Sequence, residues 1–247
     1  MISRRTVWMA LHMMVTGWGR TVFQFYLNNK ISYRENGNIS GAPWLFDEPV
    51  NTRDFMALRW YGRLWRKAVD PVDGPAQLWF RADISYPGFS RDLLWGITDI
   101  AYYGGLDDRS VRFADNRRML HRRPFYFAEY GSANKIAASN TGTAVWCLDA
   151  WFRGASGVLP WNTIGTKKSL EQAEQTALFY PCGKTPCPSV RLKAFTAAQQ
   201  LIEYMTIAGR LYGMDRTAMK DWYYRQILGE GESERHCRGI KALCRIT

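Results

Sequence analysis

The sequence predicts an α/β protein built on a parallel sheet, because short strand-like segments alternate with longer helical ones along most of the chain. The chain has 247 residues, of which 47% are hydrophobic. That content is enough for one large domain, or two small ones, with a substantial core. Polar residues follow most of the predicted strands, and in parallel sheets covered by helices this is the edge at which ligands bind.

Six segments have the apolar spacing of amphipathic helices. The clearest is 52–69, where Phe55, Leu58 and Trp65 recur at helical spacing and Pro71 ends the pattern. The spacing predicts further helices over 3–16, 108–120, 133–153, 189–211 and 215–228.

Strands are predicted where β-branched and aromatic residues gather between turn residues. These segments are 22–27, 77–82, 93–97, 125–128 and 157–159. A complete (β/α)8 barrel has eight strands, and this chain supplies five or six. We therefore expect a TIM-barrel-like domain over residues 1–228, incomplete at its N-terminus, with 229–247 as a charged tail. The alternative is an open doubly wound sheet, although no glycine fingerprint follows a first strand.

The residues at the predicted strand ends are candidates for binding a substrate. They are Asn28, Asn29, Asp83, Asp99, Glu129, Trp161 and Asn162. Taken singly, each polar residue among them is as well explained by a helix cap or a loop hydrogen bond.

Two adjacent carboxylates, Asp47 and Glu48, follow the apolar residues 44–46 and precede Pro49. In one interpretation they begin a helix, with Asp47 as the N-cap. In the other they are a catalytic pair above a strand end. The link from the strand at 22–27 is short and rich in turn residues, so we expect the pair on a returning loop rather than on a strand of its own.

Charge and cysteine content narrow the function classes. The formal net charge is +11, but the densest run of arginines, between 109 and 123, is interrupted by acids. We interpret that run as a solvated helix face and not as a nucleic-acid surface. Cys182 and Cys187 flank a turn sequence and can form a local disulfide. Neither the cysteines nor the three histidines are spaced as metal ligands, so we expect no metal or other cofactor. The N-terminal apolar stretch is too short and interrupted for a membrane span, and it shows no signal cleavage site; the compartment stays open.

Several segments, in order, resemble the glycoside hydrolase family 123-like catalytic domain, a family that includes β-N-acetylgalactosaminidases. The resemblance covers most of residues 17–212. It is carried by Tyr26-Leu27-Asn28-Asn29-Lys30, Phe46-Asp47-Glu48-Pro49, Gly157-Val158-Leu159-Pro160-Trp161, Tyr180-Pro181 and Pro188-Ser189-Val190-Arg191-Leu192.

The resemblance implies a (β/α)8 barrel and retaining, substrate-assisted hydrolysis of a terminal β-linked N-acetylhexosamine in a glycan. It makes Asp47 the residue that stabilises the sugar's acetamido group and Glu48 the general acid and base. The acid role implies a raised pKa for Glu48. Trp161 then stands where an aromatic residue would stack on a sugar, or is a core tryptophan at a barrel end. The β-sandwich expected upstream and the first barrel strands are missing, so the missing part of the barrel is a candidate partner. The alternative function is a non-catalytic glycan-binding or structural remnant.

Overall fold

The computed structural model describes residues 21–29, 43–72, 76–120, 123–171 and 176–228. The helix predicted over 3–16, the turn-rich link at 33–38 and the tail from 229 lie outside these residues. The chain divides into two compact units, Met1–Ala128 and Glu129–Thr247, and the division falls within a strand.

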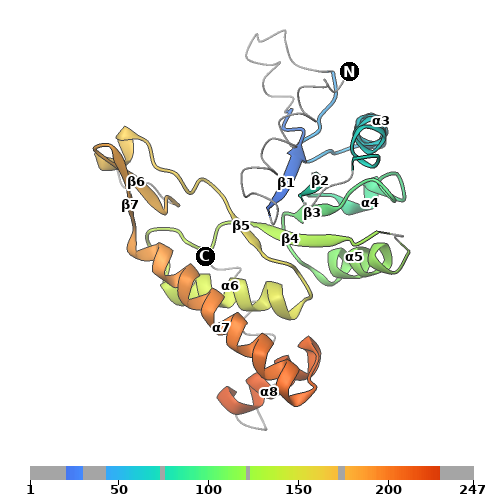
Figure 1. Cartoon of the computed structure of the whole chain (residues 1–247). Helices are drawn as coiled ribbons and strands as arrows, with labels where there is room; N and C mark the ends of the chain where they lie inside the picture. The colour runs from blue at the N-terminus through green and yellow to red at the C-terminus, as the bar shows by residue number, and fades with distance from the viewer. Residues whose placement is uncertain (1–20, 30–42, 73–75, 121–122, 172–175, 229–247) are drawn as a thin grey trace. The chain divides into compact units, whose positions relative to one another are not determined.

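The strands form one sheet in the order β1-β2-β3-β4-β5 (Figure 1). They are β1 (Val22–Tyr26), β2 (Gln77–Ile84), β3 (Ile100–Tyr103), β4 (Tyr126–Gly131) and β5 (Val158–Pro160). The pairs β1–β2, β2–β3 and β4–β5 are parallel, with Tyr26 beside Arg81 and Arg81 beside Ile100. The predicted α/β class, with strands and helices alternating along a parallel sheet, is confirmed.

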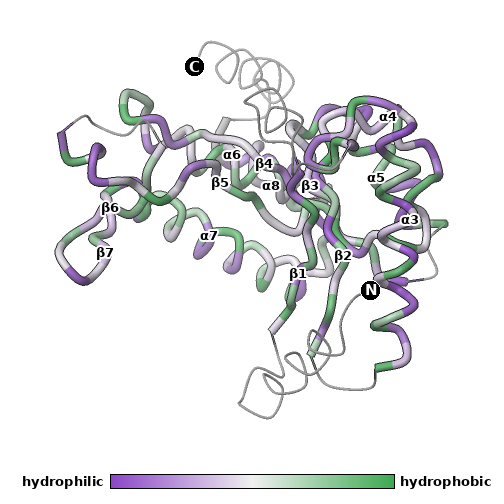
Figure 2. Tube along the Cα trace, turned by 90° about the horizontal axis from the view of Figure 1, so that it is seen from above, coloured by the Kyte–Doolittle hydropathy of each residue, from purple (hydrophilic) through white to green (hydrophobic). Residues whose placement is uncertain are grey.

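In the first unit, helices α3 (Thr52–Val69) and α5 (Asp108–Leu120) lie on the same side of β1–β3, with the short α4 (Pro87–Ser90) nearby (Figure 1). The hydropathy of α3 alternates along its length, as expected of a helix with one buried face (Figure 2). Phe25 stacks on Trp65 of α3, with ring centroids 4.4 Å apart. A Cβ at Gly62 would overlap the side chain of Ile97, so glycine lets α3 approach closely at this point.

Helix α5 corrects one expectation about charge. Arg117 is not solvated: it is 1% exposed, with its guanidinium 5.5 Å from the Phe113 ring and 5.2 Å from the Phe125 ring. Arg109 and Arg112 of the same helix are exposed, as expected for a solvated face.

The other face of β1–β3 is polar. Successive side chains of a strand point to opposite faces, and the helix-facing set includes Phe25, Phe80 and Tyr103. The opposite set, in register across the three strands, includes Gln24, Tyr26, Trp79, Arg81, Asp83 and Tyr102, together with the apolar Val22 and Ile100. Charged and hydroxyl-bearing side chains therefore project from the face that α3 and α5 do not cover.

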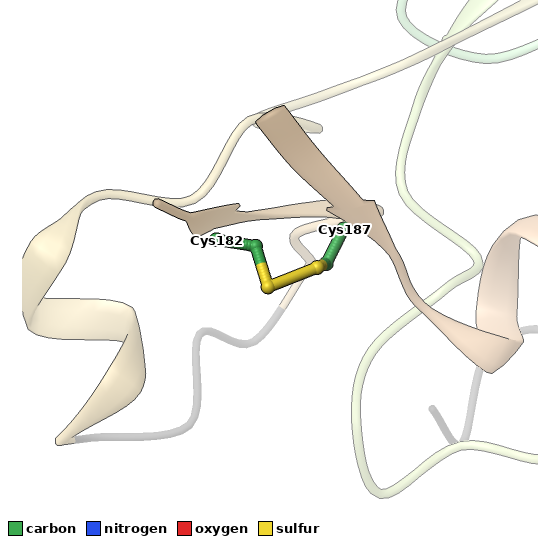
Figure 3. Close-up of a disulfide and its surroundings, with 2 residues drawn as sticks. All are labelled: Cys182 and Cys187. Carbon is green, nitrogen blue, oxygen red and sulfur yellow. A yellow bond between two sulfur atoms is a disulfide. The ribbon is translucent and has the colours of Figure 1, made fainter. Parts of the chain in front are cut away.

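The second unit is built on three helices, α6 (Asn140–Phe152), α7 (Val190–Tyr212) and α8 (Arg216–Leu228). Leu148, Phe152, Met205 and Met219 form their shared core. A short 3-10 helix, η1 (Lys167–Leu170), precedes a hairpin of β6 (Phe179–Cys182) and β7 (Thr185–Pro188). The disulfide Cys182–Cys187 links the two hairpin strands (Figure 3), as the flanking turn sequence allowed.

Two predicted elements differ from the structure. The strand expected over 93–97 is wrong: these residues form turns, in which Leu93 N donates to Ser90 O and Ile97 N donates to Leu94 O. Gly96 has φ +70°, a turn conformation, and the strand comes later, at Ile100–Tyr103. The helix expected from 133 begins only at Asn140, because Ser139 is its N-cap and accepts from Thr141 N.

Within the described part of the chain, no helix is both long enough and apolar enough to cross a membrane.

Candidate active site

Asp47 and Glu48 lie on the loop that precedes α3, and this loop is hydrogen-bonded to residues at the carboxyl ends of β1 and β2. The backbone N–H groups of Phe46 and Asp47 both donate to the carbonyl of Asn29, at 3.0 and 3.2 Å. The N–H of Glu48 donates to the carbonyl of Asp83 at 3.2 Å. Residues 43–50 form no strand, so the expectation that the pair arrives on a returning loop is confirmed.

The alternative role of Asp47 as a helix cap is wrong. The N-cap of α3 is Asn51, whose side-chain oxygen accepts from Asp54 N at 3.1 Å. The Asn51 amide also donates to the Asp54 carboxylate at 2.7 Å. Since the capping interaction is made four residues later, Asp47 is not needed to begin the helix.

Asp47 is buried, with 7% of its surface exposed, among groups of the polar sheet face. The Tyr26 hydroxyl interacts with the carboxylates of both Asp47 and Asp83. Burial, followed by the charges of Asp83 and Asp47, raises the pKa of Tyr26 far above its ordinary value. The phenol therefore stays protonated, and its single O–H is available to one of the two carboxylates at a time.

Asp83 is held by Arg81, two residues earlier on the same strand and face. The guanidinium makes a bidentate contact through Nε and Nη2, each 2.7 Å from a carboxylate oxygen. It also lies 4.3 Å from the Tyr26 ring and 4.2 Å from the Tyr102 ring. Burial raises the pKa of Asp83, Arg81 opposes that rise, and Asp47 adds to it. Stacking and the bidentate contact thus fix Arg81 on Asp83.

Glu48 is half-buried and has an unusual backbone conformation. Its φ is +59°, in the left-handed region that side chains other than glycine seldom adopt. Ser85 Oγ, just beyond the end of β2, donates to Glu48 Oε1 at 2.6 Å. Such backbone strain costs of order 1–3 kcal/mol and persists where the surroundings enforce it, most often at functional sites.

The other predicted residues of the first unit divide between the two ends of the sheet. Asn28 is exposed just after β1, and Asn29 accepts the loop's N–H groups and donates from its side chain to the Trp44 carbonyl. Asp99, however, does not join them: the expectation that it follows a strand is wrong. It precedes β3, accepts from Phe80 N at 2.6 Å and pairs with Arg66 of α3. The misplaced strand at 93–97 caused this error, and Asp99 lies on the helix-covered face.

Of the predicted residues of the second unit, Trp161 and Asn162 follow β5, whereas the expectation that Glu129 follows a strand is wrong. Glu129 lies within β4, which runs on to Gly131, and its N–H donates to the Gly157 carbonyl at 3.2 Å. Trp161 follows β5 and is 54% exposed, which contradicts its interpretation as a core residue. Asn162 has φ +52°, and its carbonyl accepts from Thr176 Oγ1 at 3.2 Å.

Sequence reasoning missed Tyr26, Arg81 and Ser85 as members of this site. A signal was present for Arg81, because a spacing of two on a strand places it on the same face as Asp83. Tyr26 and Ser85 are assigned only by their hydrogen bonds, which join residues distant in sequence. Among the described residues, no group of three or more His, Cys, Asp or Glu could hold a metal ion.

Comparisons of the chain with protein-family models, with curated proteins and with solved structures found no match.

Proposed function

We propose that the chain is a glycoside hydrolase that removes a terminal β-linked N-acetylhexosamine, preferably N-acetylgalactosamine, by a retaining, substrate-assisted mechanism. The observation that carries the proposal is the placement of Asp47 and Glu48. These neighbours are both fixed by backbone hydrogen bonds at the carboxyl ends of β1 and β2, yet their side chains have different partners.

The two environments suit two roles. Asp47 is buried beside Asp83, and Arg81 is the cation bound to that second carboxylate. The negative charge of Asp47 favours the positive charge that develops when the sugar's acetamido oxygen attacks the anomeric carbon and forms an oxazolinium ion. Glu48 is more exposed. It gives its proton to the leaving oxygen as the glycosidic bond breaks, and then takes a proton from the water that opens the oxazolinium.

The proposed architecture is part of a (β/α)8 barrel. In a doubly wound sheet helices cover both faces, whereas in a barrel the helices lie outside and the inner face carries the ligand-binding groups. The described helices α3 and α5 lie on one face of β1–β3 (Figure 1), and the other face bears Tyr26, Arg81 and Asp83. This arrangement supports the barrel over the doubly wound alternative.

The remaining predicted residues are proposed to hold the glycan. Asn28, Asn29, Glu129 and Asn162 offer hydrogen-bonding groups after or near the ends of strands. The exposed indole of Trp161 favours stacking on a sugar ring, and it is also the observation that supports a second candidate function, glycan binding without hydrolysis.

The test is Glu48→Gln, which keeps the side chain's shape but cannot supply a proton. General acid–base catalysis contributes about 10²- to 10⁴-fold to a rate. With an aryl β-N-acetylgalactosaminide whose phenol is weakly acidic, and so a poor leaving group, the rate of phenol release should therefore fall by about 10³-fold. Circular dichroism should show an unchanged fold. Glu203→Gln, on an exposed residue of α7, is the matched control and should keep the wild-type rate.

Three outcomes separate the possibilities. Loss of turnover in Glu48→Gln alone supports the hydrolase. Wild-type turnover in Glu48→Gln removes Glu48 from the mechanism. Sugar binding by a folded wild-type chain that releases no phenol favours the non-catalytic alternative.

A further inference from the structure

We propose that Ser85 is a positioning residue that determines which oxygen of Glu48 carries the transferable proton. The inference rests on the proposed function, because it concerns the acid that this function assigns to Glu48. The observation that supports this inference is the 2.6 Å hydrogen bond from Ser85 Oγ to Glu48 Oε1.

Glu48 is attached to the end of β2 at two points. Its backbone N–H donates to the carbonyl of Asp83, and its side chain accepts from Ser85, the first residue after β2. The positive φ of Glu48 turns the backbone between these two attachments. A glutamate side chain has three rotatable bonds, and a second attachment at its carboxylate removes much of that freedom.

The direction of the Ser85 bond also divides the two carboxylate oxygens chemically. Oε1 accepts the serine proton, so protonating Oε1 would set two protons against each other unless Ser85 turned away. The proton therefore resides on Oε2. In the first step the Oε2–H bond breaks and the proton passes to the glycosidic oxygen, which keeps the electron pair of the broken C–O bond. In the second step water donates a proton back to Oε2 as its oxygen bonds to the anomeric carbon, and the bond from that carbon to the acetamido oxygen breaks and returns its electron pair to the acetamido group.

The test uses Ser85→Ala and a series of aryl β-N-acetylgalactosaminides whose phenols differ in acidity. A poor leaving group needs the proton from Glu48, and a very acidic phenol leaves without it. A hydrogen bond to a charged group is worth about 1.5–3 kcal/mol, so kcat/KM for the least acidic phenols should fall at least about tenfold. For the most acidic phenol it should stay within about twofold, since that step does not use the proton.

Two further variants separate a loss of the Ser85 hydrogen bond from a general effect on the fold. Ser85→Thr retains the hydroxyl and should restore most of the rate for poor leaving groups. Ser90→Ala removes another serine hydroxyl, one that donates to the Pro87 carbonyl at 2.7 Å in nearby α4. That variant should affect all substrates of the series equally.

The outcomes distinguish this inference from the proposed function. If Glu48→Gln is inactive toward poor leaving groups but Ser85→Ala lowers kcat/KM equally for every substrate, or not at all, the role of Ser85 is overturned and the hydrolase stands. If Glu48→Gln keeps its rate with poor leaving groups, both proposals fail.

Discussion

The first unit holds two clusters of polar and charged side chains, one at each end of its strands, and each cluster includes at least one buried carboxylate. The carboxyl-edge cluster consists of Tyr26, Asp47, Glu48, Arg81, Asp83 and Ser85. The amino-edge cluster, before β3 and β4, consists of Arg66, Asp70, Asp99 and Arg123. In the second, Arg66 contacts both Asp99 and Asp70, and Arg123 lies 2.7 Å from Asp70.

The clusters differ in their balance of charge. The amino-edge cluster has two arginines and two aspartates, each paired, whereas the carboxyl-edge cluster has three carboxylates and one arginine. A closed set of ion pairs has its charges satisfied by its own members. Carboxylates with perturbed pKa values gather at functional sites, yet burial raises the pKa of Asp99 in the amino-edge cluster as it raises that of Asp83 in the carboxyl-edge cluster. Burial and a raised pKa therefore do not by themselves separate a functional cluster from a structural one, and the two clusters have to be distinguished by substitution.

Breaking the amino-edge cluster should have the largest effect on stability. Asp99 and Arg66 both have side chains that are 8% exposed, and Asp99→Ala leaves Arg66 buried with only its longer contact to Asp70. Removing one partner of a buried ion pair costs about 3–5 kcal/mol, and we expect a loss in this range in denaturant unfolding followed by circular dichroism.

A matched control comes from an exposed pair of α5, Arg118 and Asp115, 3.3 Å apart. Asp115→Ala should change the free energy of unfolding by less than about 1 kcal/mol. Equal, small losses in Asp99→Ala and Asp115→Ala would remove the structural role assigned to the amino-edge cluster.

Local patterns predicted the parts of this fold that are determined locally. Helices 52–69 and 108–120 appear with the expected bounds, because apolar spacing and Pro71 define them without help from distant residues. The returning loop with Asp47 and Glu48 also followed from the short link after 22–27. The sequence offered Asp47 as the N-cap, but the N-cap of α3 is Asn51, because the Asn51 side chain accepts from the N–H of Asp54.

Contacts between distant residues account for what the sequence did not predict. Leu93-Leu94-Trp95 is an apolar run typical of a strand, yet it forms turns that bury Leu94 and Ile97 at a spacing of three. Because the strand begins at Ile100 and not at Leu93, Asp99 precedes a strand, whereas the prediction placed it after one. The hydrogen bond from Ser85 to Glu48 spans 37 residues, and no local pattern encodes it.

A smaller effect of opposite sign is expected in the carboxyl-edge cluster. Asp47 is buried beside Asp83, and like charges in this arrangement oppose folding. Asp47→Asn keeps an acceptor for the Tyr26 hydroxyl and removes the repulsion. Neutralising a functional charge of this kind commonly stabilises a protein by about 1 kcal/mol while activity falls. Denaturant unfolding and the phenol-release assay should show both changes, and a clear loss of stability would mean that Asp47 supports the fold as Asp99 does.

The smallest expected effect is a pH dependence that compares two aspartates with opposite pKa shifts. Burial raises the pKa of Asp83 above its ordinary value of 3.8, whereas the N–H of Ser110, 2.7 Å from Asp107, lowers the pKa of that exposed carboxyl. Above pH 3.8 and up to its folded-state pKa, Asp83 binds more protons in the folded chain than in the unfolded one, so its contribution to stability is lost as pH rises.

Asp107 behaves in the reverse way: its contribution is present above pH 3.8 and is lost as pH falls through its folded-state pKa. Relative to Asp83→Asn, the wild type should therefore lose stability as pH rises through this window, and relative to Asp107→Asn it should lose stability as pH falls. Urea unfolding at half-unit steps from pH 3 to 7 measures both differences. A difference of the same sign for the two variants would contradict the assignment of Asp83 as a carboxylate whose burial outweighs its pairing with Arg81.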